Sequence, residues 1–171
     1  FYNPREMNIV PIDVHELLNK SIELTKSLLK QKKIHVIRKF ESGKPLMIMG
    51  LTRNLIEAFI NLITNACQAM DDEGTLGLKT SVELTGEQRK QLEEKGRQAL
   101  SYMMIAIKDD GCGIEAENME RIFRRFYTTR DVGHGLGLAA VQRILKKNLG
   151  HISVRSRKGK GTTFYLFLPR A

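Results

Sequence analysis

Three segments of the chain place apolar residues with the spacing of one face of a helix. Residues 14–29 form the first, and Asp13 stands where a helix N-cap is expected. Residues 51–70 form the second, and residues 138–148 form the third. The pattern therefore predicts three amphipathic helices. In the second helix the side chains predicted to be buried are Leu55, Phe59, Leu62, Ile63, Ala66 and Met70.

Shorter apolar runs predict strands around these helices. Residues 8–14 form an extended lead-in to the first helix. A turn-forming stretch with Gly43 and Pro45 separates the first two runs, which therefore predict a β-hairpin. Residues 157–161 form the turn of another predicted hairpin, near the end of the chain. The predicted strands cover residues 35–40, 46–49, 75–84, 101–108, 151–157 and 163–168.

The order of elements is one helix followed by two strands, three times over. We expect the strands to form one sheet, and the fold to be a two-layer α/β sandwich. Its mixed, mostly antiparallel sheet is expected to be covered on one face by about three helices. A charged insertion, residues 85–99, separates two of the strands. Thr85 and Gln88 have capping-box spacing, which predicts a short solvated helix without a chemical role.

Length and composition limit the possibilities further. The chain has 171 residues, 42% of them hydrophobic, which fits one compact domain and excludes wholesale disorder. No stretch approaches the roughly 20 apolar residues that cross a bilayer, and the first residues lack a signal peptide, so we expect a cytoplasmic location. Cys67 and Cys112 lack CxxC spacing, so they predict neither a disulfide framework nor a zinc site. The net charge of +9 favours nucleic acid, an acidic protein or a polyphosphate ligand as partner, without choosing among them.

A strand followed by a glycine-rich turn is the first candidate site. Asp109 ends the predicted strand, and Gly111, Gly113 and Ile114 follow it. The sheet edge would hold this carboxylate where it can accept a hydrogen bond from an exocyclic amine such as that of adenine, while the glycines let the backbone approach a flat ligand. Such a turn also occurs for steric reasons alone, so the motif does not decide by itself.

Two further features have the chemistry of a phosphate and metal site. Gly133, Gly135 and Gly137 lead into the third helix, whose first N–H groups and dipole attract phosphate, although a hinge or close packing also explains such glycines. The spacing is neither a Walker A motif nor GxGxxG after a strand. The second helix carries a polar stripe of Glu57, Asn61 and Asn65. An amide oxygen there suits Mg²⁺ shared with phosphate oxygens, although a solvent-facing edge gives the same stripe.

Together these features occur in one order along the chain: ExxxNLxxNAxxA, DxGxGI, IFxxFYTT, GxGLGL and GHISVxSxxGKGTTFxLxLP. This order resembles the ATP-binding catalytic domain of bacterial sensor histidine kinases, in the superfamily that includes gyrase B, the heat-shock chaperone ATPases and MutL. The resemblance covers the chain from about residue 8 to Pro169. It implies ATP and Mg²⁺ as cofactors, a flexible ATP lid at residues 115–134, and residues 1–7 as the remnant of a linker.

The resemblance also implies individual roles. Asp109 looks like the adenine-reading carboxylate, and Thr162 is similar to the threonine that shares a water with it. Gly111, Gly113 and Ile114 shape the adenine pocket. Asn65 looks like the Mg²⁺ ligand, Asn61 lies near the phosphates, and Glu57 occupies an acidic-or-His position. Arg130 is expected to reach the terminal phosphate. Phe123 and Phe126 match the two lid phenylalanines, and Gly133, Gly135 and Gly137 match the mobile phosphate-binding loop. The other residues expected to bind the nucleotide in this region are Thr128, Thr129, His134, Leu136 and Leu138.

Asn61 bears on the reaction. ATPases of this superfamily place a glutamate four residues before the metal-binding Asn, where it activates water. An amide cannot take a proton, so slow hydrolysis and transfer to a better nucleophile are expected. A neutral histidine already presents an unprotonated ring nitrogen and needs less help than water. His15 precedes a Glu, as acceptor histidines do, but it starts a helix directly after a strand and lacks a preceding helical hairpin.

The resemblance therefore implies an acceptor histidine on a separate dimerisation domain of the same parent protein, and a response regulator as indirect partner. We expect this chain to be a monomer, the parent to be a homodimer that can be membrane-anchored, and nucleic acid not to be a partner. Two alternatives stay open. One is a nucleotide-binding regulatory module, and the other is a gyrase-like ATPase fragment whose basic charge serves DNA.

Overall fold

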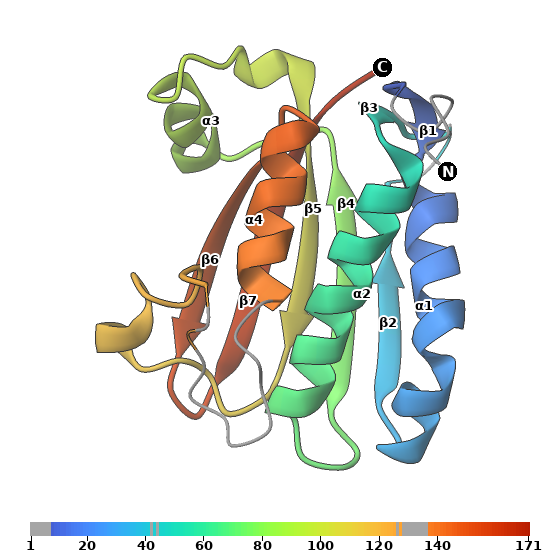
Figure 1. Cartoon of the computed structure of the whole chain (residues 1–171), viewed down its shortest axis with the longest axis vertical. Coiled ribbons are helices and arrows are strands. Elements are labelled where there is room, and N and C mark those ends of the chain that lie inside the picture. Colours follow the sequence, from blue (N-terminus) through green and yellow to red (C-terminus); the bar gives the residue numbers. More distant parts are fainter. Residues whose placement is uncertain (1–7, 42, 44, 126, 128–136) are drawn as a thin grey trace.

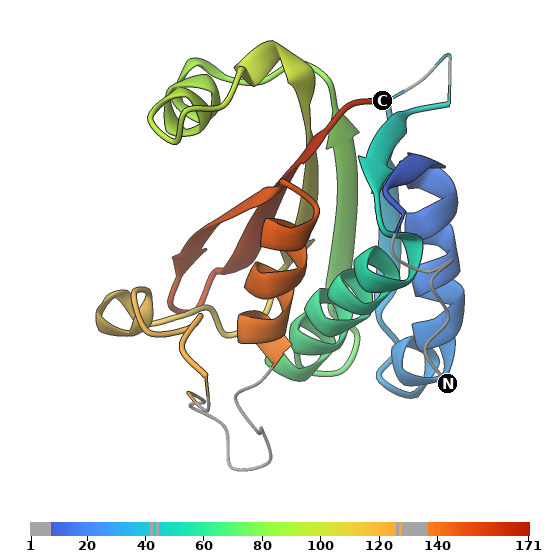
Figure 2. The same ribbon diagram turned by 45° about the horizontal axis from the view of Figure 1, so that its top comes forward.

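A computed structural model describes residues 8–41, 43, 45–125, 127 and 137–171 of the chain. Its main sheet has five strands in the order β2-β4-β5-β7-β6, and three helices cover one face of it (Figures 1 and 2). The β2·β4 pair is parallel and the other pairs are antiparallel, so the predicted two-layer sandwich is confirmed. The helices are α1 (Val14–Gln31), α2 (Thr52–Ala69) and α4 (Gly137–Lys147), and the strands are β2 (His35–Lys39), β4 (Thr75–Ser81), β5 (Tyr102–Asp109), β6 (His151–Arg157) and β7 (Gly161–Pro169).

The predicted hairpin of residues 35–40 and 46–49 is wrong. β2 instead pairs in parallel with β4, and β3 (Met47–Gly50) pairs with β1 (Val10–Asp13) in a separate two-stranded sheet. The sequence pattern predicted that all strands form one sheet, whereas the described strands form two. The physical reason is that β4 offers the longer edge to β2, whereas the Val14 N–H donates to the Leu46 carbonyl and so holds β3 beside β1.

The first N–H groups of α1 and α2 are satisfied in different ways. Asp13 is the predicted N-cap of α1, and its side chain accepts a hydrogen bond from the His15 N–H at 2.8 Å. Leu51 at the start of α2 has no cap of its own, but its N–H donates to Asn148 Oδ1 at 2.6 Å. Because Asn148 is buried just after α4 and also donates to the Ile144 carbonyl, it ties the end of α4 to the beginning of α2.

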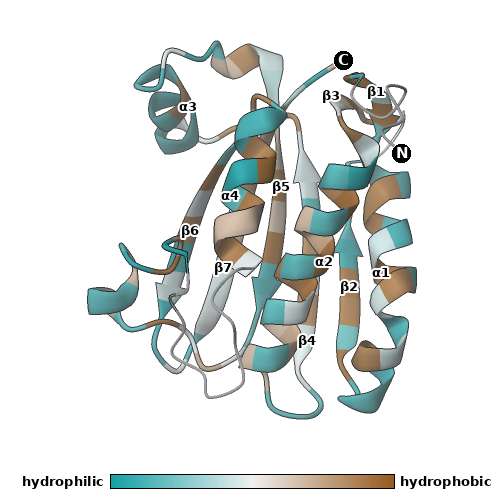
Figure 3. Cartoon of the chain, viewed as in Figure 1, coloured by the Kyte–Doolittle hydropathy of each residue, from teal (hydrophilic) through white to brown (hydrophobic). Residues whose placement is uncertain are grey.

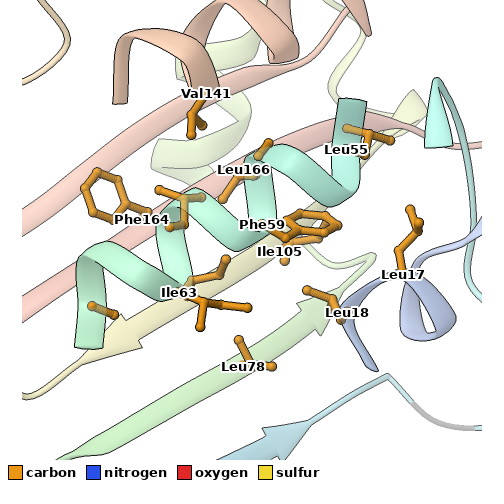
Figure 4. Packing of buried hydrophobic residues seen from close by; sticks show 14 of the residues in the cluster. Leu17, Leu18, Leu55, Phe59, Ile63, Leu78, Ile105, Val141, Phe164 and Leu166 are labelled. Carbon is orange, nitrogen blue, oxygen red and sulfur yellow. The ribbon is translucent and has the colours of Figure 1, made fainter. Parts of the chain in front are cut away.

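The main core lies between the helices and the sheet. Figure 3 shows the brown, hydrophobic sides of α1, α2 and α4 turned toward one another and the sheet. The six predicted positions on α2 are all buried, and Phe59 and Ile63 pack among Leu18, Leu78 and Ile105 (Figure 4). Fully burying such a side chain is worth about 1.5–3 kcal/mol, so this layer of contacts holds α2 against the sheet.

The insertion between β4 and β5 folds onto the opposite face of the sheet. Its helix α3 (Gly86–Glu93) begins with the predicted capping box of Thr85 and Gln88, and a short 3₁₀ turn (Ala99–Ser101) follows. Most of this helix is exposed, as predicted, but Leu92 is completely buried. It belongs to a second cluster made of Leu84, Leu92, Ala99, Tyr102, Met104, Ala106 and Phe167.

Polar contacts fix the insertion to the turn after α4. Arg97 Nη1 donates to Tyr102 Oη at 2.7 Å and also to the Leu149 carbonyl, which accepts from Tyr102 Oη at 2.8 Å as well.

Both cysteines are free thiols, and burial raises the pKa of Cys67. In the part of the chain that the structure describes, no helix has the length and apolar character needed to span a membrane.

His151 makes the stability of this region dependent on pH. Burial lowers its pKa from 6.5 to about 4, and the charges of Lys95 and Arg97 add to this shift. The unfolded chain therefore binds a proton that the folded chain does not, so the free energy of unfolding should fall as the pH drops from 7 to 5, by about 1–2 kcal/mol for this group. Urea titrations at both pH values should show that His151→Gln removes this part of the loss, whereas His35→Gln, at an exposed position, keeps it. Equal pH dependence of both variants would contradict the assignment.

Candidate functional site

The carboxylate of Asp109 is held at the end of β5. The residue is only 3% exposed, and its Oδ1 accepts hydrogen bonds from the Gly111 N–H at 2.9 Å and the Thr162 N–H at 3.3 Å. A buried carboxylate is tolerated when N–H donors satisfy it. These two bonds fix the orientation of the carboxyl plane, as recognition of a ligand amine requires.

The glycines after Asp109 are required by close packing within the protein. A Cβ on Gly111 would lie 2.4 Å from the Ala69 carbonyl oxygen, and one on Gly113, whose φ is +68°, would lie 2.1 Å from that of Arg157. The Cys112 N–H donates to the same Ala69 oxygen at 2.9 Å, and the Cys112 carbonyl accepts from the Gly159 N–H at 2.7 Å. The loop is therefore clamped between the end of α2 and the β6–β7 turn.

Ser156 was not singled out from the sequence, yet it joins the strands around Asp109. Its hydroxyl bonds to Thr162 Oγ1 at 2.8 Å, donates to the Gly161 carbonyl at 3.0 Å and accepts from the Ile114 N–H at 2.8 Å. The predicted residues Asp109, Thr162 and Ile114 therefore belong to one hydrogen-bonded network. The only sequence signal for Ser156 is its place in the GHISVxSxxGKG pattern.

Lys32 is a second residue that sequence reasoning missed. Its ammonium donates to the carbonyls of Cys67 and Met70 at 2.8 and 2.6 Å, so it satisfies the last carbonyls of α2. The Ala69 carbonyl at the same helix end accepts from Cys112. Lys32 thus stabilises the support on which the loop after Asp109 rests.

The polar stripe of α2 meets the beginning of α4. Asn61 and Asn65 are half-buried, and a Cβ built on Gly137 would lie 3.9 Å from Asn61 Oδ1 and 3.7 Å from Asn65 Nδ2. Figure 1 shows α4 starting beside the second half of α2. The first N–H groups of a helix lack intrahelical partners and carry partial positive charge, so they attract anions at this place. Glu57, one turn earlier on α2, is exposed.

Part of the predicted lid is described by the structure. Ile122 is buried, and the Phe123 ring packs edge-on against Phe164 with centroids 6.4 Å apart. Tyr127 Oη donates to Asn118 Oδ1 at 2.6 Å. Leu138, after Gly137 in α4, packs against the main core. The predicted residues Phe126, Thr128, Thr129, Arg130, Gly133, His134, Gly135 and Leu136 lie outside the described residues.

The donor set suits a magnesium ion only together with ligand oxygens. Among the described residues, no three His, Cys, Asp or Glu side chains gather as a metal site. An amide oxygen of Asn65, half-buried beside the start of α4, is a hard donor of the kind that Mg²⁺ accepts. A metal held there would need the phosphates of a nucleotide to complete its shell, which fits the residues present.

Residues 50–171 match the family model described as histidine kinase-, DNA gyrase B-, and HSP90-like ATPase. The chain belongs to this ATPase family. Its sequence relatives include the sensor histidine kinase ZraS of Escherichia coli, which is 30% identical over 167 residues, 97% of this chain and 32% of ZraS. Sporulation kinase C of Bacillus subtilis is 28% identical over 97% of this chain and 35% of its own length. This ATPase domain thus spans about a third of the length of these curated relatives.

Solved structures show the same fold. The catalytic domain of the histidine kinase ThkA superposes with a TM-score of 0.78 at 21% identity, covering 96% of this chain and 97% of that one. Full-length ShkA, solved in complex with AMPPNP, gives a TM-score of 0.77 at 25% identity over 97% of this chain and 32% of that one. The α/β architecture of the ATPase domain is therefore that of histidine kinase catalytic domains.

Close packing at the site also leaves no room for a side chain at Gly161. Gly161 has a φ of +97°, and a Cβ there would lie 2.1 Å from the Asp109 carbonyl oxygen. Gly159 has a similar φ of +74° but an open Cβ position, so it is a matched control. Gly159→Ala should cost about 1–2 kcal/mol of unfolding free energy, and Gly161→Ala at least about 2 kcal/mol more. Urea unfolding measures both variants, and equal losses would show that no close packing exists at Gly161.

Proposed function

We propose that this domain binds Mg·ATP and transfers the γ-phosphate to a histidine on a separate dimerisation domain, as the catalytic part of a two-component sensor kinase. The observation that carries the proposal is the proximity of two amide side chains, Asn61 and Asn65, to the start of α4. It brings together a metal-ligating oxygen, a helix N-terminus for phosphate, and a position that holds no general base.

Adenine recognition is assigned to Asp109 and its network. A carboxylate oriented by the Gly111 and Thr162 N–H groups accepts a hydrogen bond from the exocyclic amine of adenine. Ser156 keeps Thr162 and Ile114 in register with the carboxylate. The clamped loop gives the base a preformed edge, so little conformational freedom is lost on binding.

Phosphate positioning is assigned to the other end of the site. Asn65 would hold Mg²⁺ by its amide oxygen, and the bound ion supplies charge neutralisation of the phosphates. The first N–H groups of α4 are proposed to donate to phosphate oxygens, and Arg130 is proposed to reach the terminal phosphate. Positioning and electrostatic stabilisation account for most of phosphoryl-transfer catalysis, so this set is sufficient for transfer.

The choice of acceptor follows from Asn61. An amide beside the phosphates cannot deprotonate water, whereas a neutral imidazole nitrogen attacks the γ-phosphorus directly while the bond to the β–γ bridging oxygen breaks and ADP leaves. His15 does not suit this role, because its ring stacks on Phe40 at 4.6 Å and its Nε2 bonds to Thr80 Oγ1 at 2.9 Å. The acceptor is therefore proposed to lie on another domain. The name of ZraS as a sensor histidine kinase supports a histidine as the acceptor group.

Asp109→Asn tests the adenine assignment. The amide side chain keeps one acceptor oxygen but places a donor opposite the adenine amine, so affinity for ATP and ADP should fall by at least about tenfold. Asp110→Asn is the matched control, because the exposed neighbour only accepts from the Thr75 N–H at 2.9 Å and its amide can do the same. Isothermal calorimetry with Mg·ATP measures both. Unchanged affinity of Asp109→Asn would remove this residue from the base site.

A radiolabel assay with [γ-³²P]ATP tests the reaction. The chain alone should bind ATP, hydrolyse it slowly and gain no acid-labile phosphate, since the absence of a general base removes about 10² to 10⁴ in rate. Adding a dimerisation domain with an acceptor histidine should give labelled histidine, and Asn65→Ala should abolish this labelling while Gln68→Ala, on the exposed side of α2, retains it.

The same assay separates the alternatives. Rapid phosphate release by the chain alone would indicate a gyrase-like ATPase, and nucleotide binding without transfer to any supplied acceptor would indicate a regulatory module. Stable labelling at His15 would show that the acceptor lies within this chain.

A further inference from the structure

The face of the sheet opposite the three helices is divided into two halves. Side chains alternate along a strand, so the residues that do not face the main core point to this side. In one half, Tyr165, Phe167 and Met104 pack with the insertion and are shielded by it. The other half, at the end of β5 and across β7 to β6, is not covered by this second cluster and carries charged side chains.

Cations dominate the uncovered half. Lys79 on β4, Lys108 on β5 and Arg155 on β6 alternate with core residues and are exposed, as are Lys39 on β2 and Lys160 in the β6–β7 turn. We call these five residues the cationic face. A depression of about 260 Å³ opens at the edge of this face, next to the Asp109 network. Its lining residues are Lys108, Asp109, Arg155, Ser156, Arg157, Lys160, Gly161, Thr162 and Thr163.

The neighbouring acidic side chains do not balance this charge. Glu87 at the start of α3 pairs with Arg155, and Asp110 accepts a hydrogen bond from the Thr75 N–H. No ion pair is found for Lys39, Lys79, Lys108 or Lys160 among the described residues. Like charges at such spacing repel one another, so an anionic partner gains free energy by binding there.

We propose that the cationic face binds an acidic segment of a partner protein. Neighbouring strands are about 4.8 Å apart and alternate residues along a strand about 6.8 Å, so the cations form a grid with spacings of about 5–10 Å. Carboxylates at alternate positions of an extended segment have the same spacing and can be contacted in series. An acidic protein segment is a different ligand from the nucleotide and the acceptor histidine, so this inference goes beyond the proposed function.

The aromatic side chains on this face are covered, which argues against single-stranded nucleic acid as the partner. Proteins that bind such strands combine cations with exposed aromatic rings on which bases stack. On this face Phe167 is completely buried, Tyr102 is 8% exposed, and Tyr165 is half-buried against the insertion. The insertion thus removes the stacking surface and leaves the charges, which favours recognition of carboxylates.

The cationic face and the nucleotide site lie on opposite sides of the same strand. Lys108 and Asp109 are consecutive residues of β5, and successive side chains of a strand point to opposite faces. The depression is lined by residues of both sites, so independent binding is expected for the part of the cationic face on β2 and β4, at Lys39 and Lys79. Binding at the two sites can therefore be measured separately, and failure of one proposal is distinguishable from failure of the other.

Fluorescence anisotropy with labelled poly-L-glutamate tests the proposal on the whole chain. Lys79→Glu/Lys108→Glu reverses two charges of the face, and Lys20→Glu/Lys30→Glu makes the same change in net charge at exposed positions of α1. The face variant should bind the polymer at least about tenfold more weakly than the control variant, and rising salt should weaken binding of the wild-type chain. Affinity for Mg·ATP should be unchanged in the face variant.

Several outcomes would overturn the proposal. Equal weakening by both variants would show attraction by net charge alone, and tighter binding of duplex DNA than of poly-L-glutamate at equal charge would indicate a nucleic-acid partner. Should the doubly reversed variant fail to fold, Lys79→Gln/Lys108→Gln should still weaken binding by about threefold. Amide shifts of the ¹⁵N-labelled wild-type chain should concentrate on β4, β5 and β6 when the polymer is added, and shifts centred on α1 would contradict the assignment.

Discussion

Close contact between stretches of backbone at Asp109 is the constraint on which the site depends. The loop after β5 touches the end of α2 at Ala69 and the β6–β7 turn at Arg157, and neither contact leaves room for a side chain at Gly111 or Gly113. Three separate parts of the fold therefore meet around one carboxylate. The core layer beneath α2 matters to function through this meeting point, since a shift of α2 along the sheet would displace its end from the loop.

Local patterns predicted the features that arise locally. The three helices, the Asp13 cap and the Thr85–Gln88 capping box all depend on residues within one turn of each other. The hairpin prediction was wrong because a turn signal near Gly43 says nothing about which strand edge is available, and β4 lies far away in sequence. The sequence pattern likewise did not indicate that Leu92 is buried, since the apolar face that covers it comes from β5 and β7.

The site was predicted in part. Motif order identified Asp109, Asn65 and the residues around them, but their roles remain predictions until ligand binding is measured. The supporting residues were missed because their partners are distant: Lys32 bonds across 35 positions, Ser156 across 42 and Asn148 across 97. A lone Lys, Ser or Asn has no distinguishing pattern, so only the folded arrangement reveals that each one holds a neighbouring element in place.

The attachment of α4 at both ends has a mechanical consequence. At its far end Asn148 joins it to the start of α2, and the insertion grips the adjacent turn through Arg97. At its near end Gly137 adjoins Asn61 and Asn65. The helix is about 16 Å long, and the end held by Asn148 lies away from the proposed phosphate site. Loosening the insertion is therefore expected to shift the start of α4 relative to Asn61 and Asn65, from the opposite end of the helix.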